Sequence, residues 1–93
     1  MPKLEWRPQA RADLRAIVAY IADRNRPAAL ALRDEIRAKV GTLPEHPRLY
    51  RTGRVDGTRE MVVRPTYVVV YRETPDAVTI LRVLHTAREW PWP

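Results

Sequence analysis

Apolar residues recur every three or four positions through the first half of the chain. Over residues 8–24 this spacing marks one face of an α-helix, and Pro8 stands where a proline favours the start of a helix. The apolar stripe consists of Leu14, Ile17, Val18 and Ile21. The opposite, polar face carries Arg11, Asp13, Arg15 and Asp23. The pattern therefore predicts an amphipathic helix over residues 8–24.

A second apolar stripe follows Pro27 and ends near Gly41, a residue that commonly follows the last turn of a helix. Its members are Ala29, Leu32, Ile36, Val40 and Leu43. Only Asn25 and Arg26 separate the first helix from Pro27, and so short a connection favours an antiparallel helical hairpin.

The remaining apolar segments are short and rich in β-branched residues, as strands are. We expect strands over residues 3–7, 58–64, 67–73 and 78–85, separated by turns at Pro65 and Pro75. The predicted order is β-α-α-β-β-β in a single domain, residues 1–93. The predicted fold class is α+β, in which an N-terminal strand and a helical hairpin precede a three-stranded antiparallel meander, with the hairpin on one face of the sheet.

Alternation assigns the side chains of the last two strands to faces. In residues 67–73, Tyr67, Val69 and Tyr71 share one face and Val68 and Val70 the other. In residues 78–85, Arg82 falls on the face of Val78, Ile80 and Leu84, opposite Thr79, Leu81, Val83 and His85. Since arginine interrupts that apolar face, we expect the face to be open and Arg82 to lie at its rim.

Composition narrows the class of protein. The chain has 93 residues, 45% of them hydrophobic and 30% charged, and a net charge of +6. Fifteen of the 17 basic residues are arginine, whose planar guanidinium suits phosphate and carboxylate, so an anionic partner is expected. There is no cysteine, no signal-peptide core and no run long enough to span a bilayer, so we expect a cytoplasmic protein without membrane contact. We expect neither a metal nor a cofactor, since the two histidines lie far apart and no phosphate-binding glycine motif is present.

Candidate chemistry gathers near the C-terminus. His85 ends the last predicted strand, and the ordinary pKa of imidazole suits proton transfer near neutral pH. Arginines that could surround it and stabilise a phosphate are Arg59, Arg64, Arg82 and Arg88. The same four arginines could instead dock acidic protein side chains. Trp90 is expected to fold back over the sheet, while Trp92 carries no assignment.

The chain resembles the RelE/ParE superfamily of toxins from type II toxin–antitoxin systems, which includes the plasmid stabilization proteins. The opening WRPQARADLRAIVAYIADRN is similar to the first helix of that superfamily. GTREMVVRPTYVVVYRE and VTILRVLHTAREWP are similar to its closing strands, with the elements G-x-R-E, Y-x-V-x-Y and V-x-H-x-x-R. The resemblance covers nearly the whole chain and implies the fold predicted above.

The resemblance implies two alternative activities. ParE-like members inhibit DNA gyrase, whereas RelE-like members are metal-independent endoribonucleases that cleave mRNA on the ribosome. RelE-type nucleases place arginine after the tyrosine that opens the penultimate strand, but this chain has Val68 there and no tyrosine after Tyr71. Losing one such donor can cost about 10²–10³ in rate. The ParE side is therefore favoured, with Arg59, Arg64, Arg82, Arg88 and Trp90 as target-binding residues.

If the chain is a nuclease instead, the resemblance implies that His85 handles the proton and that Arg64, Arg82 and Arg88 hold the scissile phosphate. On either alternative it implies a hetero-oligomer with a cognate antitoxin. We expect an acidic antitoxin to cover the helical hairpin and the open sheet edge.

Overall fold

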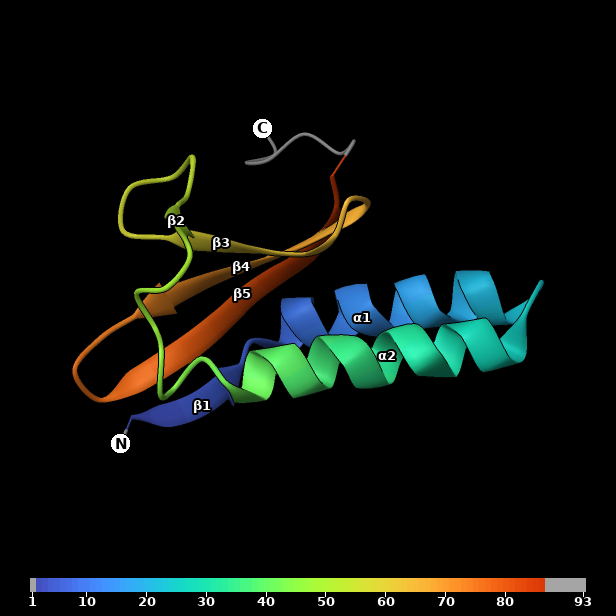
Figure 1. The fold of residues 1–93 in the computed structure, drawn as a ribbon, viewed down its shortest axis with the longest axis horizontal. Coiled ribbons are helices and arrows are strands. Elements are labelled where there is room, and N and C mark those ends of the chain that lie inside the picture. The colour runs from blue at the N-terminus through green and yellow to red at the C-terminus, as the bar shows by residue number, and fades with distance from the viewer. Residues whose placement is uncertain (1, 87–93) are drawn as a thin grey trace.

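The computed structural model describes residues 2–86, which form one five-stranded sheet and two helices (Figure 1). The elements in chain order are β1 (Lys3–Trp6), α1 (Pro8–Ala22), α2 (Arg26–Gly41), β2 (Arg51–Thr52), β3 (Arg59–Arg64), β4 (Tyr67–Glu73) and β5 (Ala77–His85). The predicted α+β fold class is confirmed: N-terminal strand, helical hairpin and antiparallel meander follow one another as expected. The two-residue β2 was not predicted.

The sheet order is β1-β5-β4-β3-β2. The pairs β2–β3, β3–β4 and β4–β5 are antiparallel, whereas β1 lies parallel to β5 and is an edge strand. The two helices lie side by side along one face of the sheet, and their connecting turn projects beyond the strands (Figure 1). None of the helices within residues 2–86 is both long and apolar enough to cross a membrane.

The core lies between the helical hairpin and the sheet. Both predicted helical stripes point into it: Leu14 and the whole second stripe are buried, and Ile17, Val18 and Ile21 pack against them. α1 begins at Pro8, as expected. The side chain of Asn25 caps α2 by accepting a hydrogen bond from the Ala28 amide at 3.1 Å.

The predicted alternation holds along β4 and fails along β5. Val69 and Tyr71 belong to the core under the helices, and Val68 and Val70 to a small cluster on the other face. In β5 the pairing register shifts opposite Val70 and Tyr71, so one extra residue enters the strand. Beyond this bulge the faces exchange. Contrary to the prediction, Val83 joins the helix-side core and Leu84 the opposite cluster.

Tyr71 gives this core a measurable pH dependence. Its hydroxyl donates a 2.7 Å hydrogen bond to the Pro47 carbonyl, and burial raises the pKa of Tyr71 to about 12 from 10.0. The unfolded chain therefore releases this proton first, so the stabilisation is complete below pH 10.0 and is lost as the pH rises through about 12. We expect Tyr71→Phe to cost about 1 kcal/mol at neutral pH and to flatten the alkaline loss of stability. Urea unfolding of both proteins at a series of alkaline pH values measures this, and parallel curves would contradict it.

Candidate functional site

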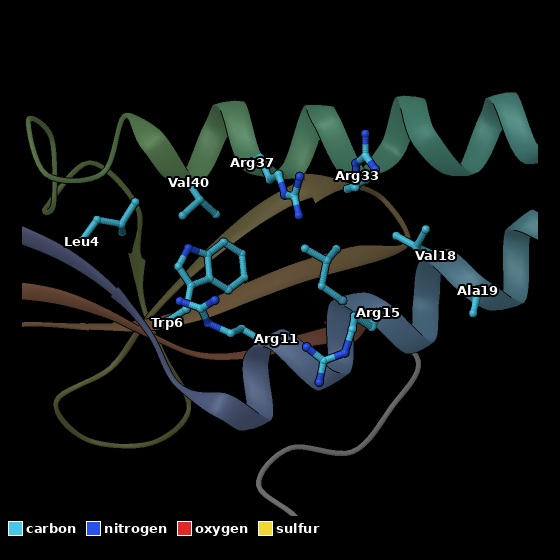
Figure 2. Close-up of a pocket in the computed structure, with 10 residues that line it drawn as sticks. Leu4, Trp6, Arg11, Arg15, Val18, Ala19, Arg33, Arg37 and Val40 are labelled. Atoms are coloured by element: carbon cyan, nitrogen blue, oxygen red, sulfur yellow. The ribbon is translucent and has the colours of Figure 1, made fainter.

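A groove of about 750 Å³ runs between the two helices beside β1. Figure 2 shows Trp6 between the helices, with Arg11 and Arg15 on α1 and Arg33 and Arg37 on α2. Each pair is four residues apart, which places both members on one side of their helix. The apolar lining consists of Leu4, Trp6, Leu14, Val18, Ala19 and Val40. The groove thus combines an apolar floor with cationic walls.

The positive charge of this groove is largely uncompensated. Among the described residues, Arg33 alone of the four arginines has an acidic partner, Asp34, at 3.1 Å. That ion pair is on the surface, where water screens it, so it removes little of the positive potential. An apolar floor between rows of cations complements an amphipathic helix with acidic flanks. Sequence reasoning missed this site, although arginines four residues apart on both predicted helices were a signal for it.

The outer edge of β1 continues the groove. Within residues 2–86, β1 pairs with β5 on one side only, and no strand pairs with its other side. Leu4 and Trp6 of this strand line the groove, since residues two apart in a strand share a face. An extended peptide could therefore pair with β1 while its neighbouring residues occupy the groove.

Two of the predicted site residues lie at one end of the sheet. Tyr67 of β4 pairs with Arg64 on one side and His85 on the other. The rings of Tyr67 and His85 meet edge to face with centroids 5.5 Å apart. Arg64 donates two hydrogen bonds to Glu35 of α2, at 2.7 and 3.0 Å. This contact lowers the pKa of Glu35 and raises the pKa of Arg64, so both groups stay charged.

Arg82 is held by Asp13 of α1. Its guanidinium donates two hydrogen bonds to the Asp13 carboxylate, at 2.7 and 3.0 Å, and its side chain is only 11% exposed. Asp13 also accepts hydrogen bonds from the Val83 amide and the Gln9 side chain. The Asp13 carboxylate thus takes the place of a strand partner at Val83, beyond the residues of β5 that pair with β1. The assignment of Asp13 to a polar outer face was therefore wrong, because β5 offers it a cation and an amide.

Arg59, another predicted site residue, is not brought to this end. Arg59 begins β3, at the opposite end of the strand from Arg64, and donates a 2.8 Å hydrogen bond to the Tyr50 carbonyl. Arg88 and Trp90 lie outside the described residues. Within residues 2–86, His85 is thus accompanied by Arg64 and Tyr67, while Arg82 is engaged by Asp13.

The sheet face opposite the helices is apolar at Val68. RelE-type nucleases carry an arginine at this position, whereas here the Val68 side chain is buried in a cluster with Val70, Leu81 and Leu84. Val68 therefore packs against hydrocarbon side chains. Within the described residues, no three histidine, aspartate or glutamate side chains gather as metal ligands would.

Comparison with known proteins gives a consistent set of relatives. The family described as the ParE toxin of the type II toxin–antitoxin system, parDE, matches residues 4–90. The protein Y4kP of Sinorhizobium fredii is 36% identical over 96% of this chain and 93% of its own length. Toxin RelE2 of Caulobacter vibrioides is 34% identical over 95% of this chain and 99% of its own.

Solved structures agree with these relatives. The chromosomal ParDE system of Pseudomonas aeruginosa contains a chain that superposes with a TM-score of 0.81 at 26% identity, over 91% of this chain and 96% of that one. The RelBE2 toxin–antitoxin complex of Mycobacterium tuberculosis contains one with a TM-score of 0.62 at 27% identity, over 91% and 99%.

Proposed function

The chain belongs to the ParE toxin family of type II toxin–antitoxin systems, and we propose that it arrests growth by acting on DNA gyrase. The observation that supports gyrase over ribosome-bound mRNA concerns two positions at which a ribonuclease would need groups that contact phosphate. Val68 is buried among hydrocarbon side chains, and Arg82 is neutralised by Asp13. A toxin that binds a protein target needs no such catalytic groups.

The proposal is tested with refolded toxin in gyrase supercoiling and DNA-cleavage assays. We expect inhibited supercoiling and accumulated cleaved DNA at toxin concentrations comparable to the enzyme. Pre-incubation with the antitoxin is the control and should restore supercoiling. Full gyrase activity in the presence of folded toxin would overturn the choice of target.

The His85→Ala variant separates recognition from proton transfer. If gyrase is the target, we expect the concentration for half-inhibition to change by no more than about twofold, because binding to a protein target requires no proton transfer by His85. Circular dichroism and thermal unfolding confirm that the variant is folded. A folded variant that no longer arrests growth would indicate that His85 performs chemistry.

Ribosome-dependent cleavage of mRNA is the alternative. It is favoured by the contact of His85 with Tyr67, by the position of Arg64 in the same row, and by a relative named RelE2. Toe-printing of mRNA on translating ribosomes tests it directly. Cleavage that is abolished in His85→Ala and Arg64→Gln would replace gyrase inhibition as the activity.

We also propose where the antitoxin binds. The arginine-lined groove would receive an acidic amphipathic helix, and the free edge of β1 would pair with an extended segment next to it. Two kinds of observation support this: the charge pattern of the groove, and solved relatives that are toxin–antitoxin complexes. Binding at these surfaces would make the functional unit a hetero-oligomer of toxin and antitoxin.

A further inference from the structure

Glu60 of β3 is a buried carboxylate whose ion-pair partners are exposed arginines. Its side chain is only 2% exposed, yet it accepts a 3.0 Å hydrogen bond from Arg51 and lies 3.6 Å from the guanidinium of Arg54. Its other oxygen accepts the backbone amide of Arg54 at 3.1 Å. Burying a carboxylate is costly, and replacing a whole buried ion pair by apolar residues often gives equal or greater stability. Its presence fixes two cations in defined positions.

Hydrogen bonds within the loop between β2 and β3 fix the conformation of the segment that carries Arg54. The Gly53 amide donates to the Thr58 carbonyl at 2.7 Å, and the Thr58 hydroxyl donates to the Val55 carbonyl at 2.6 Å. Gly57 has a φ of +81°, a conformation that glycine adopts without strain. Gly53 lies so close to Thr58 that a side chain at this position would collide with it. A loop fixed at so many points loses little entropy when it binds a partner.

A third arginine lies on the same face. Arg51 pairs with Glu60 across β2 and β3, and Glu60 pairs with Val70 of β4. Since alternate residues share a face, Arg72 is exposed on this side two residues beyond Val70. The helices cover the opposite face (Figure 1). The side chains of Arg51 and Arg54 are 60% and 49% exposed.

We propose that Arg51, Arg54 and Arg72 form a binding surface for the phosphodiester backbone of nucleic acid. The three arginines carry three positive charges, and Glu60 and the loop residue Asp56 carry two negative charges. The surface therefore has a net positive charge. β2 and β4 are two strand spacings apart, so the surface spans roughly 10 Å, or about three phosphates at 3.4 Å of rise per nucleotide. The guanidinium edges that Glu60 leaves unused suit phosphate oxygens.

Nucleic-acid binding by this surface is a property additional to the proposed action on gyrase. It can be measured in the absence of that enzyme. It is also separate from the groove, whose lining comes from β1, α1 and α2. If the toxin binds gyrase while gyrase holds DNA, the arginine surface would contact the DNA directly.

Three variants of equal net charge test the proposal. Arg72→Gln removes one exposed cation of the surface. The triple variant Arg51→Gln/Arg54→Gln/Glu60→Gln removes two cations together with the carboxylate they share, so no buried charge is left unpaired. Arg26→Gln, at the start of α2 on the far side of the molecule, is the control (Figure 1). Each variant lowers the net charge by one, so an effect of net charge alone would be the same in all three.

Binding of antitoxin-free toxin to a short fluorescent DNA duplex is followed by anisotropy between about 50 and 200 mM salt. We expect Arg26→Gln to bind like the parent, Arg72→Gln about threefold or more weakly, and the triple variant about tenfold or more weakly. The slope of log affinity against log salt should fall by about 0.9 for each phosphate contact removed. The side chain of Arg72 is exposed and makes no hydrogen bond within the described residues, so its replacement should leave folding intact. Circular dichroism checks the triple variant.

The results that would overturn this binding surface differ from those that would overturn the gyrase target. Equal losses in all three variants, or none in any, would overturn the proposal. Competition by polyglutamate as strong as by unlabelled DNA would also overturn it in favour of an acidic protein partner. Single-stranded RNA of the same length is the second probe, and whichever nucleic acid binds more tightly identifies the source of the phosphates. A toxin that inhibits gyrase but shows no such DNA binding refutes this surface alone, while DNA binding without gyrase inhibition refutes only the gyrase target.

Discussion

Replacing Asp13 with alanine is expected to lower the free energy of unfolding by about 3–5 kcal/mol. The aspartate binds the Arg82 guanidinium through two hydrogen bonds and accepts the Val83 amide at 3.0 Å. Alanine would remove the carboxylate from a nearly buried cation and a buried amide, and losing one partner of a buried pair costs far more than the pair contributes. Because a domain of this size has about 5–15 kcal/mol of stability in total, the variant should lose a large fraction of its stability.

Urea unfolding of refolded toxin, monitored by tryptophan fluorescence, measures this loss. Asp34→Ala is the matched control, since Asp34 also pairs with an arginine but on the surface, where the pair contributes at most about 1 kcal/mol. Asp13→Asn should fall between the two, because the amide oxygen can still accept one hydrogen bond. If Asp13→Ala were no less stable than Asp34→Ala, the contact between α1 and β5 would not be a principal support of the fold.

Asp13 also marks the limit of what the sequence could predict. Helical periodicity identified the apolar stripes because their members are buried against one sheet, so local spacing and tertiary packing agree. The same periodicity placed Asp13 on the solvent side. Its burial depends on Arg82 and the Val83 amide, which lie some seventy residues away in the chain and leave no local signal.

The other features that were predicted wrongly or not at all have the same origin. The bulge in β5 arises from pairing with β4, and without it alternation assigned Val83 and Leu84 to the wrong faces. The parallel pairing of β1 with β5 follows from the path of the chain through both helices, which the four residues of β1 do not encode. The groove is lined by residues of β1, α1 and α2, so the pattern of any one segment of the sequence could not predict it.

Reversing two charges in the groove is expected to separate toxin from antitoxin. In the double variant Arg15→Glu/Arg37→Glu, one cation on each helix becomes an anion, so an acidic partner helix meets repulsion where it met attraction. Like-charge contacts at an interface cost several kcal/mol, and about 3 kcal/mol corresponds to a loss of affinity of about a hundredfold or more. Both side chains are exposed, so the fold should be unaffected.

Isothermal titration calorimetry with purified antitoxin measures the affinity, and growth of cells that express both proteins measures the consequence. The control is Arg7→Glu/Arg26→Glu, which makes the same change in net charge at two exposed arginines that do not line the groove. Both lie at helix N-termini, where a carboxylate is favourable, so the control should fold as well as the parent.

Comparing antitoxin binding by the groove variant and by the control shows whether the arginine-lined groove binds the antitoxin or whether the edge of β1 does so alone. If the groove holds its helix, the groove variant should remain toxic when antitoxin is present, whereas the control should be neutralised. An antitoxin in which acidic residues of that helix are replaced by lysine should then neutralise the groove variant better than it neutralises the parent toxin. An affinity unchanged by the double reversal would mean that the antitoxin binds elsewhere, and the free edge of β1 would be the remaining surface to test.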